Sequence, residues 1–100
     1  MGKPDPAAAD AAIALLAGSF GATGASAEIA LRGAYNLSLS GFGTAVVALQ
    51  RSFDGGASWK TLDSFAGDAE LAGHETEDGM LYRLDCMAWS DGAIVYRLSR

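Results

Sequence analysis

The chain has few of the residues from which reactive centres are built. It contains one cysteine, Cys86, and one histidine, His74, among its 100 residues. A single cysteine excludes a disulfide within the chain and any metal site that needs several cysteines. A catalytic cysteine would need a histidine partner, and no spacing supports that pairing here. We therefore expect Cys86 to be a small buried thiol in a strand, and His74 to be a bystander in a loop.

Basic residues and long apolar runs are also scarce. Seven Lys and Arg residues stand against 12 Asp and Glu residues, which gives a formal net charge of -5. Such a surface repels a phosphate backbone, so nucleic acid is not an expected partner. A membrane-spanning helix needs about twenty consecutive apolar residues, and the run Ala12–Ala17 is far shorter. We therefore expect no membrane partner either.

Both prolines lie in the first 24 residues, at Pro4 and Pro6, in a stretch rich in alanine and glycine. Within it, residues 7–16 have the composition of a short helix that Pro6 can begin and Gly18 can end. A helix of this length is marginal in water unless it docks on another surface, so a disordered arm is the alternative.

Residues 1–24 are therefore predicted to be an arm that precedes the folded domain. Acidic residues stand where a secretory leader would have a basic start, which argues against a cleaved signal. We expect the arm to contact a neighbouring subunit, with a flexible tail as the competing interpretation. The residues proposed for this contact are the large apolar residues of the arm together with Ala12, which precedes the first of them: Ala12, Ile13, Leu15, Leu16 and Phe20.

From residue 25 onward, apolar and polar residues alternate with a period of two. Ile94, Tyr96 and Leu98 alternate with smaller or polar residues, and glycine-containing turns separate such runs at intervals of about ten residues. We predict an all-β domain over residues 25–100, a small antiparallel sandwich or barrel of six to seven strands with consecutive strands paired. Residues 68–76 form either an edge strand or a loop.

The clearest local signal is a tight turn at Asp54, Gly55 and Gly56. Dipeptides of Asp-Gly and Gly-Gly between two apolar runs indicate a hairpin, because glycine reaches positive φ without a steric penalty. The segment from Ser52 to Trp59 has the spacing Ser-x-Asp-x-Gly-x-Ser-Trp and resembles the Asp-box of sialidases and other β-propellers. That resemblance implies a structural turn in which the aspartate accepts hydrogen bonds and the tryptophan covers the base.

No set of residues predicts catalysis. The acidic residues of the second half are expected to be solvated on loops: Asp63, Asp68, Glu70, Glu75, Glu77 and Asp78. Two carboxylates act as acid and base only when a cleft fixes their separation, and the EF-hand spacing for calcium is missing. Arg51, Lys60, Arg83 and Arg97 are expected on solvated faces, where Arg83 and Arg97 can pair across strands with Asp85 or Asp63. We predict a protein that is not an enzyme and has no cofactor or metal.

Several segments taken together resemble small virion proteins of tailed bacteriophages and of gene transfer agents. The matching segments are Tyr35–Gly41, Val47–Gly56 with Trp59, Tyr82–Leu84 and Tyr96–Ser99, and they follow one another in the order found in that family. The resemblance covers roughly residues 30–100. The alanine-rich arm departs from shorter members of the family, which begin almost directly at the first strand.

The resemblance implies a structural role in a virion or phage-like particle assembled in the bacterial cytoplasm. The closest role is a head spike base or capsid decoration protein. Such a protein anchors a spike or fibre on the capsid. The implied partners are further copies of the chain, in a homo-oligomer such as a pentameric ring, together with a capsid protein and a spike or fibre protein.

Two other functions remain open from the sequence. A carbohydrate-binding module would present Trp59, Trp89 or Tyr35 on one exposed face. A tail or baseplate component would be built in the same way as a head protein but would follow three-fold or six-fold symmetry instead of five-fold.

Overall fold

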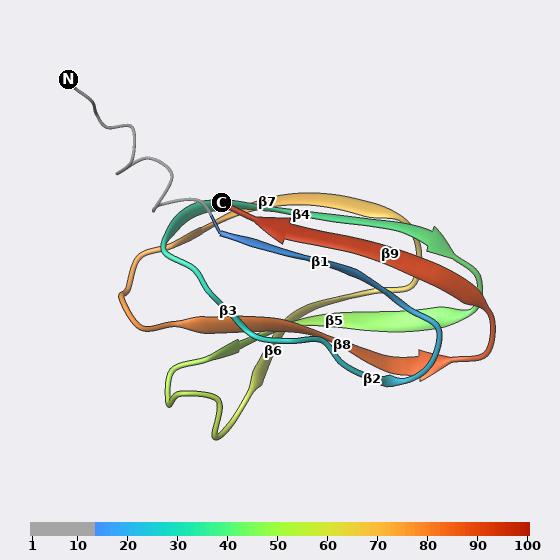
Figure 1. Cartoon of the computed structure of the whole chain (residues 1–100), viewed down its shortest axis with the longest axis horizontal. Coiled ribbons are helices and arrows are strands. Elements are labelled where there is room, and N and C mark those ends of the chain that lie inside the picture. Colours follow the sequence, from blue (N-terminus) through green and yellow to red (C-terminus); the bar gives the residue numbers. More distant parts are fainter. Residues whose placement is uncertain (1–13) are drawn as a thin grey trace.

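The structure is a computed structural model that describes residues 14–100 (Figure 1). This part of the chain contains strands and no helix. The strands are β1 (Leu15–Phe20), β2 (Gly24–Ala25), β3 (Ile29–Ala30), β4 (Gly33–Phe42), β5 (Ala45–Ser52), β6 (Lys60–Phe65), β7 (Ala69–Glu75), β8 (Leu81–Trp89) and β9 (Gly92–Ser99).

The strands form two antiparallel sheets that pack face to face (Figure 1). The first sheet has the order β1-β9-β4-β7, and the second has the order β2-β8-β5-β6, with β3 also paired to β8. Since β2 and β3 lie along the same strand, they act as one interrupted edge strand. The chain crosses from sheet to sheet at almost every connection, which is the winding of a jelly roll.

The predicted fold class is confirmed: the domain is an all-β antiparallel sandwich. The described part of the chain holds nine strands instead of six to seven. The difference comes from β1, which lies in the expected arm, and from the start of the predicted domain. There the alternation of Ile29 and Leu31 predicts one strand, and the structure has the two short strands β2 and β3.

The prediction that consecutive strands pair is wrong for most of the chain. Among the strands of residues 14–100, only β5 and β6 form a hairpin of neighbours within one sheet. β8 and β9, joined at Ser90-Asp91-Gly92, belong to different sheets. That turn packs on the turn between β4 and β5, where Thr44 accepts hydrogen bonds from the N–H groups of Ser90 (2.8 Å) and Asp91 (3.3 Å). A glycine turn signals a reversal of the chain, but it does not specify whether the chain returns in the same sheet.

The expected arm is only partly an arm. Residues Leu15–Phe20 form β1, which pairs with β9 in a continuous register from Leu15 opposite Ser99 to Phe20 opposite Ile94. A helix that includes Leu15 and Leu16 is therefore wrong, because the open edge of β9 offers backbone hydrogen bonds that outweigh helix propensity. Residues 7–13 of the predicted helix, which include Ala12 and Ile13, lie outside the described residues.

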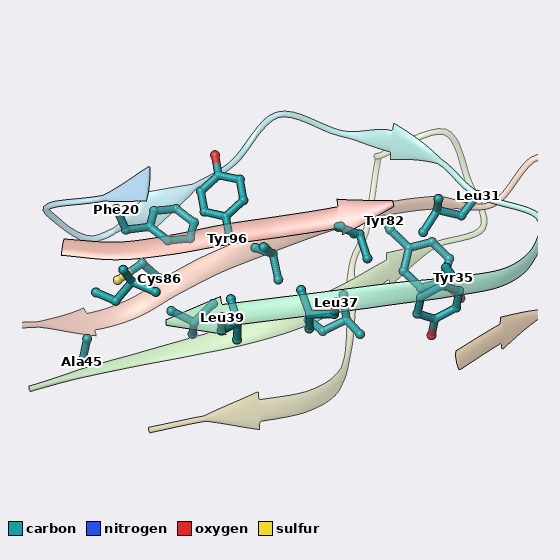
Figure 2. Close-up of a cluster of buried hydrophobic side chains, with 14 of the residues drawn as sticks. Phe20, Leu31, Tyr35, Leu37, Leu39, Ala45, Tyr82, Cys86 and Tyr96 are labelled. Carbon is teal, nitrogen blue, oxygen red and sulfur yellow. The ribbon is translucent and has the colours of Figure 1, made fainter. Parts of the chain in front are cut away.

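The core lies between the sheets and has an aromatic pair toward each end (Figure 2). Phe20 packs on Tyr96 with ring centroids 4.8 Å apart, and Tyr35 packs on Tyr82 at 5.1 Å. The predicted inward alternation is confirmed on β8 and β9 and at the residue before β8, where the following residues are buried: Met80, Tyr82, Leu84, Cys86, Ile94, Tyr96 and Leu98.

Two edge-strand glycines make room for these tyrosines. A Cβ atom at Gly18 of β1 would meet the hydroxyl oxygen of Tyr96 at 2.6 Å, and a Cβ at Gly73 of β7 would overlap the ring of Tyr35. Each tyrosine lies directly opposite its glycine in the cross-strand register. The large side chain covers the backbone of the glycine, which compensates for the side chain that the edge strand lacks.

Residues 68–76, predicted as an edge strand or a loop, contain β7, which is the edge of the first sheet. β7 pairs with β4 over seven residues without a bulge, from Ala69 opposite Leu39 to Glu75 opposite Gly33. His74 therefore lies in a strand and not in a loop. The more buried face of β7 carries the small residues Ala69 and Gly73 together with Leu71 and Glu75, so the strand packs with only Leu71 as a large apolar residue.

Candidate functional site

The turn after β5 is closed by side chains of its own sequence. The Ser52 hydroxyl donates to Asp54 Oδ1 (2.7 Å) and accepts from the Gly56 N–H (2.9 Å). Ser58 donates its N–H to Asp54 Oδ1 (2.9 Å) and its hydroxyl to Asp54 Oδ2 (2.6 Å). Gly55 and Gly56 take φ angles of 73° and 94°, which side chains with a Cβ rarely adopt.

These contacts make Asp54 a structural acceptor. The hydrogen bonds from Ser58 and Ser52 lower the pKa of its carboxyl from 3.8 to about 2, because they favour the ionised form. Both carboxylate oxygens are already used within the turn. Ser52, Asp54, Gly55 and Gly56 therefore lie in a self-contained loop, as the Asp-box spacing implies, and no ligand is needed to complete it.

Trp59, the last residue of this motif, takes part in a polar row across the outer face of the second sheet. The Arg83 guanidinium lies 4.4 Å from the centre of the Trp59 ring. Arg83 Nε also donates to Gln50 Oε1 (2.8 Å), and Gln50 Nε2 donates to Thr61 Oγ1 (3.3 Å). The row joins β8, β5 and β6, and the guanidinium covers one face of the indole.

This row changes two expectations. Within the described residues Arg83 forms no ion pair with Asp85 or Asp63, because Gln50 accepts its hydrogen bond. Trp59 is partly buried, with one face occupied, so it does not offer a free stacking platform on that side.

A second polar cluster closes the gap between the sheets where Tyr35 and Tyr82 pack. Glu75, at the end of β7, is 3% exposed. Arg51 of β5 in the opposite sheet binds it at two points, with Nε 2.5 Å from Oε1 and Nη2 2.9 Å from Oε2. The Tyr82 hydroxyl donates to Oε1 (2.8 Å), and the Glu77 N–H donates to Oε2 (3.0 Å).

The donors around Glu75 fix its charge. The Arg51 hydrogen bonds are the main cause that lowers the pKa of the Glu75 carboxyl from 4.5 to about 2, while burial acts in the opposite direction. The same pair raises the pKa of Arg51, and burial is the main cause that raises the pKa of Tyr82. An ionised carboxylate with four donors in place is suited to hold two sheets together and poorly suited to accept a proton.

The prediction that Glu75 is a solvated loop residue is therefore wrong, as is the placement of Arg51 on a solvated face. Arg51 follows Val47 and Leu49 at a spacing of two, so the alternation itself directs it inward. The sequence contained that signal for Arg51. It contained no signal that Glu75 would lie opposite, because residues 51 and 75 meet only through the crossing of the chain between sheets.

An open pocket of about 380 Å³ lies at the other end of the sandwich. Apart from one tryptophan, the lining residues are small, and two of them carry hydroxyl groups: Gly43, Thr44, Ala45, Val46, Ala66, Ala88, Trp89 and Ser90. The indole N–H of Trp89 donates to the Gly92 carbonyl at 3.0 Å, and the side chain is 37% exposed. The lining has no titratable side chain and so offers shape and an aromatic surface without acid or base groups.

Trp59, Trp89 and Tyr35 do not share an exposed face. Tyr35 is buried in the core, Trp59 lies under Arg83, and Trp89 lines the pocket at the far end of β8. Arg83 and Trp89 are six positions apart on β8, a distance of about 20 Å along an extended strand. The aromatic platform expected of a carbohydrate-binding module is thus reduced to Trp89.

The residues proposed for subunit contact differ in their surroundings. Phe20 is buried in the core of its own chain, Leu16 packs partly against that core, and Leu15 is 57% exposed. Of the described three, only Leu15 presents most of its side chain to a partner.

The remaining candidate groups are separated from one another. Cys86 is buried as expected, and burial raises the pKa of its thiol. Among the described residues no group of three or more His, Cys, Asp or Glu side chains is placed to hold a metal ion. That part of the chain also has no helix long and apolar enough to span a membrane.

No family model, curated protein or solved structure matches the chain.

Proposed function

We propose that this chain is a structural protein of a phage-like particle, a head spike base or capsid decoration subunit that works through protein contacts and not through catalysis. The proposal rests on the resemblance of four segments to small virion proteins. In the structure these segments lie on β4, on β5 with its turn, on β8 and on β9, which are the central strands of the two sheets. The resemblance therefore follows the core of the fold.

The site geometry is consistent with this role. Asp54 and Glu75, whose carboxyl pKa values are lowered, both accept hydrogen bonds from donors of the same chain, so they stabilise the fold. A double-sheet jelly roll occurs in viral capsid proteins, but also in lectins and cupins. The fold therefore agrees with a role in a particle but does not distinguish that role from the others.

The proposed partners are further copies of the chain, a capsid protein and a spike or fibre protein. The test is to express a tagged copy in the source cells and purify the particles that they release. We expect the tagged chain to co-purify in a fixed ratio to the capsid protein and to appear as density at the capsid surface in electron micrographs. The proposal would be refuted if the purified particles had their normal composition but did not contain the tagged chain. Density on the tail with three-fold or six-fold order would favour the tail component.

A second candidate function is glycan binding, which the pocket beside Trp89 favours. A half-exposed indole next to small residues and the hydroxyls of Thr44 and Ser90 can stack on and hydrogen-bond a sugar ring. A glycan array is the test. Binding that is lost in Trp89→Ala and kept in Trp59→Ala would support this function, and an array without signal would exclude it for the glycans present.

A further inference from the structure

The four edges of the sandwich differ in how they are protected against pairing with another strand. β6 has a bulge at Leu62 and charged residues at Lys60 and Asp63. β7 carries two charged residues: Glu75 points inward, and Glu70 lies on the opposite, exposed face. The edge formed by β2 and β3 consists of two-residue pieces. Bulges, inward charges and short strands are the devices by which natural sheets prevent association at their edges.

β1 has none of these devices. Its sequence, Leu-Leu-Ala-Gly-Ser-Phe, contains no charge and no proline, and its register with β9 runs through all six residues without a bulge. Among residues 14–100 no strand pairs with its other side. A regular, uncharged and exposed edge strand is a site where another strand adds to the sheet.

The backbone groups available on this edge can be assigned. Ala14 and Arg100 exchange two hydrogen bonds, at 3.3 and 3.0 Å. Bonded and non-bonded pairs alternate along an antiparallel ladder, so the even-numbered residues of β1 direct their N–H and C=O groups toward β9. Leu15, Ala17 and Ser19 therefore direct theirs away from the sheet.

We propose that β1 pairs with β1 of a second copy of this chain, antiparallel and about a two-fold axis through Ala17. In this register Ala17 faces Ala17 of the second copy, and Leu15 faces Ser19 in both directions. Each of these three pairs exchanges two hydrogen bonds, since the odd-numbered residues supply the free groups on both strands. The two four-stranded sheets then become one continuous sheet.

The side chains on the outer face favour a second copy as the occupant. Leu15 and Val95 are 57% and 54% exposed, and Val95 lies next to Ser19 in the register of β1 with β9. The pairing places Leu15 of each chain beside Ser19 of the other, one strand away from Val95. Leu15 of one chain thus approaches Val95 of the other chain, with the small Ser19 between them. The two-fold axis repeats this contact on its other side.

Charge gives a further reason. The chain has a net charge of -5, so two copies repel unless they meet through an uncharged surface. β1 is such a surface, whereas self-pairing of β6 or β7 would bring charged residues into the contact.

An edge contact of this size is small, so we expect a dimer that dissociates on dilution. This dimer forms from the purified chain alone. It can therefore be tested independently of the proposed function and of the pentameric ring.

The experiment is sedimentation velocity of the purified full chain over a wide concentration range. We expect the mass to rise from one to two copies as concentration increases. Ala17→Pro removes an outward N–H at the centre of the pairing and should weaken the dimer at least about tenfold. Ala72→Pro is the matched control, because Ala72 is also an exposed alanine at the centre of an edge strand of the same sheet, with its N–H directed outward by the same alternation.

Charge variants test the position of the axis. Ala17→Lys places two like charges opposite each other and should give a monomer, as should Ala17→Glu. A mixture of the two should restore a one-to-one dimer, because each lysine then faces a glutamate. Circular dichroism checks that each variant keeps the sheet. A wild-type chain that stays monomeric throughout, a mixture that does not associate, or a dimer disrupted equally by Ala72→Pro would overturn the proposal.

Discussion

Arg51 and Glu75 come from different sheets of the sandwich and form a two-point ion pair across the gap between them, with the shorter contact at 2.5 Å. The glutamate side chain is 2% exposed and the arginine side chain 26%. Tyr82 contributes a third side-chain contact to the same carboxylate. The arrangement links β5, β7 and β8 at the point where the hydrophobic core ends.

Glu75→Gln should destabilise the protein by about 2–4 kcal/mol, because it leaves a largely buried guanidinium without its charged partner. Chemical denaturation measures the change. Glu77→Gln is the control, since Glu77 approaches the same arginine at 3.5 Å but has a side chain that is 65% exposed. That variant should cost less than about 1 kcal/mol. Equal losses of unfolding free energy in the two variants would show that the buried ion pair stabilises the protein no more than the exposed one.

Acid should weaken the fold through the same residue. The pKa of Glu75 is lower in the folded chain, about 2 against 4.5, so its contribution is complete above about pH 5 and is lost as the pH falls toward 2. The loss amounts to at most about 3 kcal/mol. Denaturation at a series of pH values should show a steeper acid decline in the wild type than in Glu75→Gln. Asp54 titrates in the same window in both proteins, so it does not affect the difference.

Ser52→Ala should open the turn after β5. The Ser52 side chain is fully buried, and its hydroxyl both donates to Asp54 and accepts from the Gly56 N–H. Loss of these bonds should cost about 1–2 kcal/mol, measured as a lower midpoint of thermal or chemical unfolding. Ala57→Ser, at an exposed position in the same turn, should change stability little.

Gly73→Ala should destabilise the sandwich by about 1–3 kcal/mol, because the added Cβ overlaps the ring of Tyr35 and displaces it from Tyr82. Gly67→Ala is the matched control: nothing lies within 4 Å of the added atom and the residue does not have positive φ. That change should be neutral or slightly stabilising. A stable Gly73→Ala variant would mean that Tyr35 has another place to pack.

Cys86 should react slowly with thiol reagents in the native protein. It is 1% exposed, and burial raises its pKa, so little thiolate is present or accessible at neutral pH. Absorbance of a released chromophore measures the rate, and the same reagent in denaturant gives the unprotected rate as a control. Fast labelling of the folded chain would show that β8 opens easily.

The alternation of apolar residues predicted the all-β class and the buried faces of β8 and β9 because side chains in a strand point to opposite sides in turn. The Asp-Gly-Gly turn was also readable, since its hydrogen bonds join residues no more than four apart. The sequence predicts a helix or an arm for Leu15–Phe20, because alanine and leucine favour a helix in isolation. Only the presence of β9 beside these residues makes them a strand.

By itself, the sequence determined the properties that depend on near neighbours: the period of two, the positive-φ glycines of the turn, the single buried thiol and the negative net charge. Which strands share a sheet is decided only in the tertiary structure, and with it that Glu75 meets Arg51 and that β1 is an uncharged edge with no second partner among residues 14–100. The physical reason is that backbone pairing between distant strands depends on how the whole chain winds. A turn sequence favours a reversal without specifying the sheet to which the chain returns.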